Sequence, residues 1–148
     1  MYDTILLPTD GSDNAELASD RAIAVADTFG ATLHVLYVVE RTRDDPETKG
    51  IEEKVSEELN RGREVVEGVE KRAANGEVET TTTVEPGVPR STIADYAEEH
   101  GIDLIVIGST GADDPTDKLL GTVSKFVVNE APADVLTVRP DESLSGPD

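Results

Sequence analysis

The sequence predicts an α/β fold in one domain over residues 1–140: an open parallel sheet of five strands with helices on both faces. Two observations lead to this prediction. Short apolar segments alternate along the chain with longer segments whose apolar residues recur every three or four positions, which are the patterns of buried strands and of amphipathic helices. The 148 residues suffice for one domain and hardly for two. Because strands and helices alternate, we expect right-handed crossovers and parallel strands.

Five segments have the pattern of strands. Four of them are short and mostly apolar, which is typical of strands buried on both faces of a parallel sheet; they span residues 4–8, 33–39, 104–107 and 135–138. Residues 79–84 differ, because a run of threonines favours a strand that is less buried and lies at a sheet edge. Residues 86–89 contain two prolines and a glycine and predict a turn after this strand.

Apolar residues at helical spacing predict the four helices that connect these strands. The first helix is built from small residues, which suits close packing on a sheet, and Gly30 ends it. Asn75-Gly76 ends the long second helix, and Gly101 ends the third. The apolar positions are, in chain order, Ala18, Ala22, Val25, Ala26 and Phe29; Ile51, Val55, Leu59, Gly62, Val66, Val69 and Ala73; Ile93, Ala94, Ala97 and His100; and Val123, Phe126 and Val127.

The net charge of the chain limits the classes of partner that it can bind. Thirty-two acidic and 13 basic residues give a formal net charge of −19. A surface this negative repels DNA, RNA and anionic lipid, so we expect neither a nucleic-acid nor a membrane partner. The composition, acidic and without tryptophan, is typical of a halophilic protein, because concentrated salt reduces the Debye length to about 3 Å and screens the repulsion between carboxylates. An ordinary acidic protein remains the alternative.

Other residue types exclude several classes of site. The chain has no cysteine, which excludes disulfides, thiolate metal sites and a cysteine nucleophile. His34 and His100 are far apart in the sequence and suggest no transition-metal site; His34 is predicted to be a hydrogen-bonded core residue. The N-terminus lacks a signal-peptide pattern, and no segment approaches the roughly 20 apolar residues of a membrane span, so we expect a cytoplasmic protein. Residues 141–148 are expected to form a frayed polar tail.

Two segments follow strands where parallel sheets bind ligands, at the carboxyl ends where the strand order reverses. The first is Pro8-Thr9-Asp10-Gly11-Ser12. The second is Gly108-Ser109-Thr110-Gly111, followed after nine residues by Gly121-Thr122-Val123-Ser124. Its glycines allow close approach of backbone, and its hydroxyls and a helix start near Thr122 predict an anion site made of N–H donors. Alternatively, these glycines only form turns, and Thr116-Asp117 caps a continuous helix that runs on to Phe126; the pattern leaves both interpretations open.

Together these segments resemble the universal stress proteins of the ATP-binding-motif type. The resemblance covers nearly the whole chain and implies the strand order 3-2-1-4-5, an adenine-nucleotide α-hydrolase-like fold, ATP across the ends of the first and fourth strands, and a homodimer paired through the last strand, Val135-Val138. The segments that carry it are Ile5 to Ser12, Leu33-His34-Val35, Gly87-Val88-Pro89 with Ile93 and Ala97, the spacing Gly108-x2-Gly111-x9-Gly121-Thr122, and Ala131 to Arg139.

The resemblance also assigns roles to matching residues. Asp10 is implied to contact the ribose, whose two hydroxyls a carboxylate can accept from; a turn or helix-cap role is the alternative. Val35 is implied to line the adenine pocket. Gly108, Gly111 and Gly121 are implied to admit the phosphates, and Thr122 is implied to donate to them. The other residues of the expected cofactor-binding site are Pro8, Thr9, Ser109, Val123 and Ser124.

One segment departs from the family pattern. The position after the second glycine is often basic in this family, whereas here it is Ala112, followed by Asp113 and Asp114. Two carboxylates beside a triphosphate are unfavourable without a cation, so we expect ATP to bind with Mg²⁺, and Lys118 offers a further compensating charge.

The expected function is that of an ATP-binding stress-response protein, regulatory rather than catalytic. No placed general base and no arginine finger are recognisable, so any ATPase activity would be slow. A dimeric scaffold that does not bind nucleotide is the main alternative, supported by Ala112-Asp113-Asp114. An ATP pyrophosphatase and a phosphoacceptor receiver domain fit poorly, because the first strand leads to Pro8-Thr9-Asp10-Gly11-Ser12 and the third to Glu85-Pro86.

Overall fold

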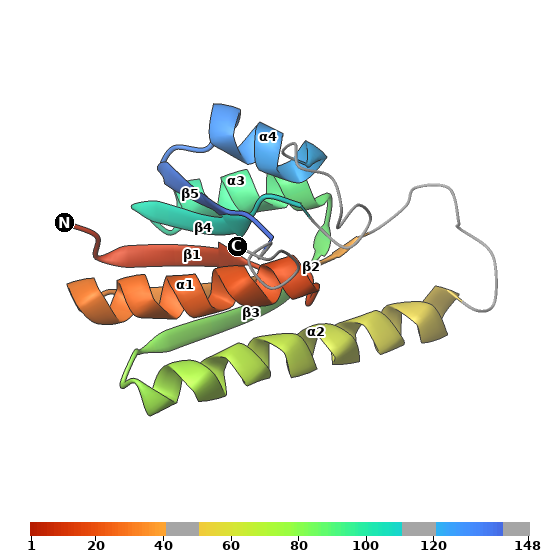
Figure 1. Ribbon diagram of the computed structural model, residues 1–148. Coiled ribbons are helices and arrows are strands. Elements are labelled where there is room, and N and C mark those ends of the chain that lie inside the picture. The colour runs from red at the N-terminus through yellow and green to blue at the C-terminus, as the bar shows by residue number, and fades with distance from the viewer. Residues whose placement is uncertain (41–50, 111–120, 141–148) are drawn as a thin grey trace, which may run out of the picture.

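The computed structural model describes residues 1–40, 51–110 and 121–140 and contains one five-stranded parallel sheet (Figure 1). The strand order is β3-β2-β1-β4-β5, as the family resemblance implied. Every pair of neighbouring strands is parallel. The elements are β1 (Thr4–Pro8), α1 (Asp13–Phe29), β2 (Thr32–Glu40), α2 (Ile51–Asn75), β3 (Thr80–Gly87), α3 (Pro89–Glu99), β4 (Leu104–Gly108), α4 (Thr122–Glu130) and β5 (Asp134–Val138).

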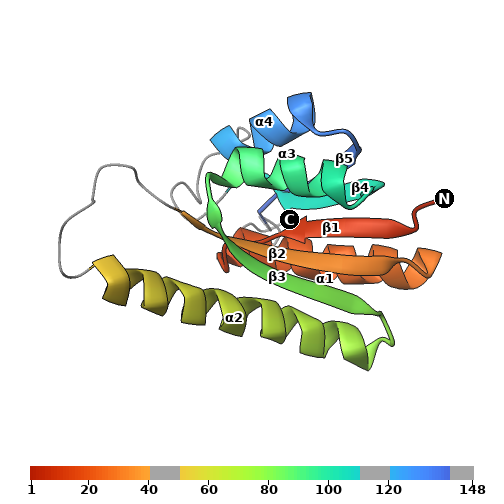
Figure 2. The same cartoon turned by 180° about the vertical axis from the view of Figure 1, so that it is seen from behind.

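Helices cover both faces of the sheet, which confirms the predicted layering. Helix α1 lies in front of the sheet in Figure 1. Figure 2 gives the view from the opposite side, in which α3 lies in front of the sheet. On the first face, Ala18, Ala22 and Ala26 of α1 are fully buried, so the predicted close packing of small residues is confirmed. Because the central strand β1 lies between two strands and two helix layers, Ile5, Leu6 and Leu7 are completely buried, which explains its apolar run.

Helix α2 packs against β2 and β3 through a glycine. A Cβ at Gly62 would lie 2.7 Å from the Tyr37 ring and 3.0 Å from Val84. Real Cβ atoms do not approach so closely, so only glycine allows the helix to lie directly on this ring. The predicted apolar positions Val66, Val69 and Ala73 of the same helix are all buried in the same core cluster.

Two local predictions are wrong. Phe29 was predicted in the buried stripe of the first helix, but its side chain is 43% exposed; at the last turn of α1 it packs edge-to-face on Tyr2, with ring centroids 5.3 Å apart. The turn predicted at 86–89 begins later, because β3 continues through Pro86 to Gly87. Proline is tolerated there since β3 is an edge strand and needs hydrogen bonds on one side only.

The two histidines, which are far apart in the sequence, lie together in the fold. The rings of His34 on β2 and His100 at the end of α3 have centroids 5.6 Å apart. Tyr96 joins them: its hydroxyl is 2.7 Å from Nδ1 of His34, and its ring stacks on His100 at 3.8 Å. The prediction that His34 is hydrogen bonded is confirmed, although its side chain is only partly buried.

This cluster predicts a pH dependence of stability. Burial, followed by the charge of His100, lowers the pKa of His34 below its ordinary value of 6.5. The unfolded chain therefore takes up a proton at His34 before the folded protein does, and stability falls as the pH drops from 6.5 through the lowered pKa. Denaturant unfolding between about pH 7.5 and about pH 5.5 measures the loss. His34→Gln retains an acceptor for the Tyr96 hydroxyl and should lose less stability than the wild type; equal losses would contradict the prediction.

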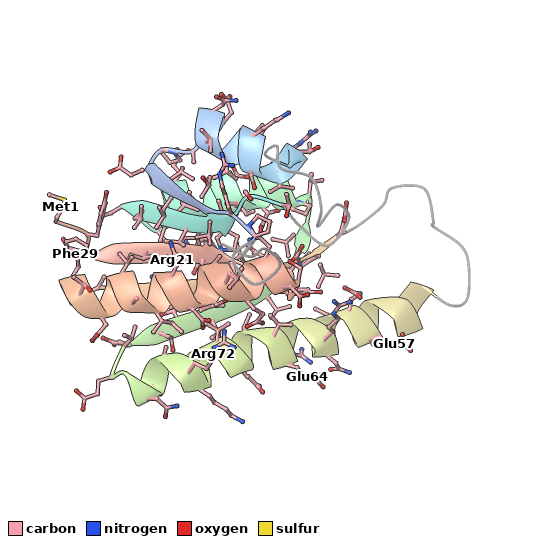
Figure 3. All side chains as sticks on the ribbon, in the orientation of Figure 1. Met1, Arg21, Phe29, Glu57, Glu64 and Arg72 are labelled. Atoms are coloured by element: carbon pink, nitrogen blue, oxygen red, sulfur yellow. The ribbon has the colours of Figure 1, made fainter. Side chains whose placement is uncertain are left out.

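The acidic surface predicts that the stability of the fold depends on the salt concentration. Arg72 of α2 points toward α1 in Figure 3 and pairs with Glu16 at 2.8 Å and with Asp20 at 3.8 Å. Such exposed pairs contribute little, whereas the net charge of −19 repels itself throughout the molecule. We therefore expect a clearly higher melting temperature in about 1 M KCl than in dilute KCl, because salt screens this repulsion. Equal melting temperatures would contradict the halophilic interpretation.

No helix within the described ranges has the length and apolar character that crossing a membrane requires.

Candidate functional site

A cavity of about 660 Å³ opens at the carboxyl ends of β1, β2 and β4. Its position agrees with the rule that parallel sheets bind ligands where the strand order reverses, since β1 lies between β2 and β4. Helices α2, α3 and α4 supply the remaining walls. Residues that line the cavity include Pro8, Thr9, Asp10, Leu36, Tyr37, Glu40, Glu58, Arg61, Ile93, Ile107, Gly108, Thr110, Gly121, Thr122, Val123, Ser124 and Lys125.

Most of the residues predicted for the site line this cavity. The structure brings together two segments that are a hundred residues apart in the sequence: Pro8, Thr9 and Asp10 after β1, and Gly108, Gly121, Thr122, Val123 and Ser124 around β4 and α4. Gly111 lies outside the described residues, as do Ala112, Asp113, Asp114 and Lys118.

The prediction that Val35 lines the cavity is wrong. Its side chain is fully buried in the core cluster beneath α1 and α2, and the residues of β2 that reach the cavity lie further along the strand. Side chains alternate between the two faces of a strand, so the neighbouring Leu36 joins the opposite core cluster and lines the cavity.

The loop after β4 uses its N–H groups for its own structure. The N–H of Ser109 donates to the carbonyl of Val138 at 2.8 Å, and that of Thr110 donates to Oδ1 of Asn14 at 2.9 Å. The N–H of Gly121 donates to the carbonyl of Ser109 at 2.7 Å. Of the predicted donor segment from Gly108 to Ser124, these three N–H groups are therefore not available to an anion. Ser109, which is buried, does not line the cavity.

The hydroxyl of Ser124 also has a structural role. It donates to the carbonyl of Gly108 at 2.7 Å and so ties the first turn of α4 to the end of β4. A Cβ at Gly108 would lie 2.9 Å from Oδ1 of Asn14, so this glycine is needed for the close approach of α1 to the loop. The glycine and the two hydrogen-bonded side chains thus position the start of α4 at the cavity.

The amino end of α4 lies at the wall of the cavity. Gly121, the N-cap residue, has an extended conformation, with ψ of 169°, and as a glycine it supplies no capping side chain of its own. The helix therefore begins at Thr122, as predicted, and the alternative of a continuous helix running through Gly121 is wrong. The N–H groups of the first turn, on Thr122, Val123 and Ser124, have no acceptor within the helix, and the helix dipole makes this end positive. Lys125 lines the same wall.

Asp10 lies in the turn between β1 and α1. Its Oδ1 accepts a hydrogen bond from the N–H of Ser12 at 2.9 Å, and Gly11 adopts a positive φ of 78°. Ser12, whose Oγ accepts from the N–H of Ala15 at 3.3 Å, caps the helix. Asp10 is thus a turn residue and not the helix cap, and its exposed side chain also lines the cavity.

Sequence reasoning missed one whole wall of the cavity. Tyr37 of β2 and Glu58 and Arg61 of α2 all line it, and the Tyr37 hydroxyl donates to Oε2 of Glu58 at 3.1 Å. Burial, followed by the charge of Glu58, raises the pKa of Tyr37 above its ordinary value. The position of Tyr37 near the carboxyl end of a strand was a usable signal. Glu58 and Arg61 gave none, since helical periodicity does not show that α2 reaches the cavity.

The remaining wall is apolar. Leu36, Ile93 and Ile107 belong to the core cluster under α3 and α4 and also line the cavity. The cavity therefore offers an apolar surface, a positive helix end and polar groups on Asp10, Tyr37 and Glu58. Such a combination can hold a small molecule with one apolar and one anionic part.

Comparisons with known proteins agree with this architecture. A universal stress protein of Methanocaldococcus jannaschii is 36% identical over 141 residues, which cover 94% of this chain and 83% of that protein. The solved universal stress protein from Lactobacillus plantarum has a TM-score of 0.82 and 33% identity, and the match covers 93% of this chain and 98% of that one. A universal stress protein solved in complex with cAMP has a TM-score of 0.74 and 25% identity, with 95% and 99% covered.

By its similarity to these solved proteins, the chain has the adenine-nucleotide α-hydrolase-like fold, with the strand order β3-β2-β1-β4-β5. The model of one family, described as the universal stress protein family, matches residues 1–139. Since this match spans nearly the whole sequence, the chain belongs to the universal stress protein family.

Proposed function

We propose that the cavity binds an adenine nucleotide, with ATP as the main ligand, and that the protein is a cytoplasmic regulator of a stress response. The observation that carries this proposal is the amino end of α4, where Thr122, Val123 and Ser124 face the cavity without a capping side chain. First-turn N–H groups at the positive end of a helix bind phosphate. Lys125 adds a positive charge at the same place.

The other walls support a nucleotide. The apolar surface of Leu36, Ile93 and Ile107 suits a flat base, and Asp10 offers a carboxylate to sugar hydroxyls. The volume of about 660 Å³ lies within the range of about 300–1,000 Å³ that small-molecule pockets have. The solved relative in complex with cAMP holds a ligand of the same chemical class.

The role that we propose is regulatory rather than catalytic. Backbone N–H groups hold a phosphate without activating a water molecule. The cavity at the amino end of α4 is therefore suited to bind a nucleotide rather than to hydrolyse one. We propose Mg²⁺ as a companion of ATP, because Asp10, Glu40 and Glu58 all line the cavity and their charges oppose a triphosphate.

Calorimetry with ATP, ADP, AMP and cAMP, each with and without Mg²⁺, tests the proposal. We expect measurable heat for adenine nucleotides, a higher melting temperature in their presence, and tighter binding of ATP with Mg²⁺. Mass spectrometry of the denatured protein would identify any nucleotide retained during purification. If millimolar nucleotide produces neither heat nor stabilisation, the alternative of a dimeric scaffold that does not bind nucleotide is correct.

We also propose that the protein forms a homodimer through β5. Among the described strands β5 pairs only with β4, and Val135, Leu136 and Thr137 are partly exposed. Such an edge presents unpaired backbone groups, and proteins seldom leave it uncovered. A second copy of the same strand would satisfy these groups in a symmetric interface.

Leu136→Pro is expected to convert the dimer to a monomer, because proline removes a ladder N–H and distorts the strand edge. Sizing chromatography at micromolar concentration measures the change, and circular dichroism checks that the variant is folded. Val135→Lys, which places a charge at the same edge, gives a second test if the proline variant does not fold. A wild-type protein that elutes as a monomer would contradict the proposal.

A further inference from the structure

The buried ring of Tyr37 fixes a carboxylate at the cavity. Tyr37 is only 4% exposed, and its ring lies directly against Gly62 of α2, so the packing leaves the ring little room to turn. Its hydroxyl donates to Oε2 of Glu58, one helical turn before Gly62. Glu58 lines the cavity, and the hydrogen bond from the Tyr37 hydroxyl holds its carboxylate in place. A carboxylate held in this way loses little side-chain freedom when a ligand binds.

Several charged groups surround the same hydroxyl. Burial and the negative charges of Glu58 and Asp10 raise the pKa of Tyr37, and the positive charge of Arg61 opposes them. Asp10 from the turn after β1 and Glu58 from α2 line the cavity from two different elements. These residues differ from the apolar wall and from the amino end of α4, since they offer carboxylate oxygens, which accept hydrogen bonds.

The three parts of the cavity correspond to the three parts of a nucleotide. The base matches the apolar wall, the phosphates match the start of α4, and the ribose, whose hydroxyls are donors, matches the carboxylates. We propose that Glu58, held by Tyr37, determines specificity by accepting a hydrogen bond from a ribose hydroxyl, so that the site prefers ribonucleotides to deoxyribonucleotides. This inference rests on the proposed binding of an adenine nucleotide.

The test compares AMP with 2′-deoxy-AMP and 3′-deoxy-AMP by calorimetry. A hydrogen bond to a charged group contributes about 1.5–3 kcal/mol, so the wild type should bind AMP roughly ten to a hundred times more tightly than the analogue that lacks the contacted hydroxyl. In Glu58→Ala this ratio should approach one, because AMP loses affinity and that analogue does not. The lost charge of Glu58 acts equally on all three monophosphates and cancels in the ratio.

Three variants separate this role from a structural one. Glu58→Gln retains a weaker acceptor and should give an intermediate ratio. Tyr37→Phe keeps the ring under Gly62 but releases Glu58, so it should reduce the ratio without changing the melting temperature. Glu57→Ala is the matched control, because Glu57 is exposed on the outer side of α2 (Figure 3), and it should retain the wild-type ratio.

The outcomes distinguish the two proposals. If the wild type binds AMP but does not discriminate against either analogue, or if Glu58→Ala leaves the ratio unchanged, the role of Glu58 is overturned while nucleotide binding stands. If the wild type binds none of the three ligands and ATP as well gives no heat, both proposals are overturned.

Discussion

Gly121→Val is expected to weaken ATP binding by about a hundredfold or more while leaving the fold intact. Gly121 precedes the first turn of α4, and its position lines the cavity beside the N–H groups proposed to hold the phosphates. A side chain there excludes a phosphate from close approach. The loss of two charge-assisted hydrogen bonds, each worth about 1.5–3 kcal/mol, accounts for the magnitude.

The structure itself accommodates the substitution. A Cβ at Gly121 would lie 3.5 Å from the carbonyl oxygen of Ser109 and 3.7 Å from Cα of Thr110, which are ordinary contacts. Its φ of −68° suits any residue. The melting temperature without ligand should therefore change little. Gly68→Val is the control, because a Cβ at Gly68 has no neighbour within 4 Å, and this variant should bind ATP like the wild type. Unchanged ATP affinity in Gly121→Val would place the phosphates elsewhere.

Asn14→Leu is expected to destabilise the protein by about 3 kcal/mol and to disorganise the site. Asn14 is 5% exposed and links three segments. Its Nδ2 donates to the carbonyl of Val138 at 3.0 Å, and its Oδ1 accepts from the N–H and the hydroxyl of Thr110 at 2.9 and 3.1 Å. Leucine has a similar size but leaves the buried N–H of Thr110 without an acceptor, which adds a desolvation cost to the lost bonds.

Denaturant unfolding measures this effect, with Asp13→Leu as the control because Asp13 is the exposed neighbour on the same helix turn. We expect an unchanged dependence of the unfolding free energy on denaturant and a lower midpoint for Asn14→Leu. ATP affinity should fall as well, since Thr110 lines the cavity and loses its anchor. A loss below about 0.5 kcal/mol, typical of surface substitutions, would show that the linkage contributes little.

The local elements could be predicted because their signals lie within a few residues. Alanines at helical spacing placed the buried face of α1, and the threonine run marked β3 as an edge strand. Glycine and hydroxyl residues around Thr122 indicated where α4 begins. The order of the strands came from the resemblance to a family and not from these patterns, since periodicity shows that a face is buried but not which element covers it.

The site was predictable only in part for the same reason. Pro8, Thr9 and Asp10 and the start of α4 were found because ligands bind at strand ends in this kind of sheet. Sequence spacing did not reveal that Asn14 accepts from the N–H of Thr110, 96 residues away, so donors that looked available to a ligand are used by the protein. A hydrogen bond needs partners within about 3 Å, and only the folded chain decides which distant groups meet.

The sequence by itself determined the fold class, the burial of β1 and the negative surface, because these follow from composition and from the local repeat of apolar residues. Only the tertiary structure placed Val35 in the core, joined His34 to His100 through Tyr96, and brought Glu58 to the cavity. Each of these depends on which face of one element meets another, and that is set by the packing of α2 and α3 on the sheet, which no local pattern records.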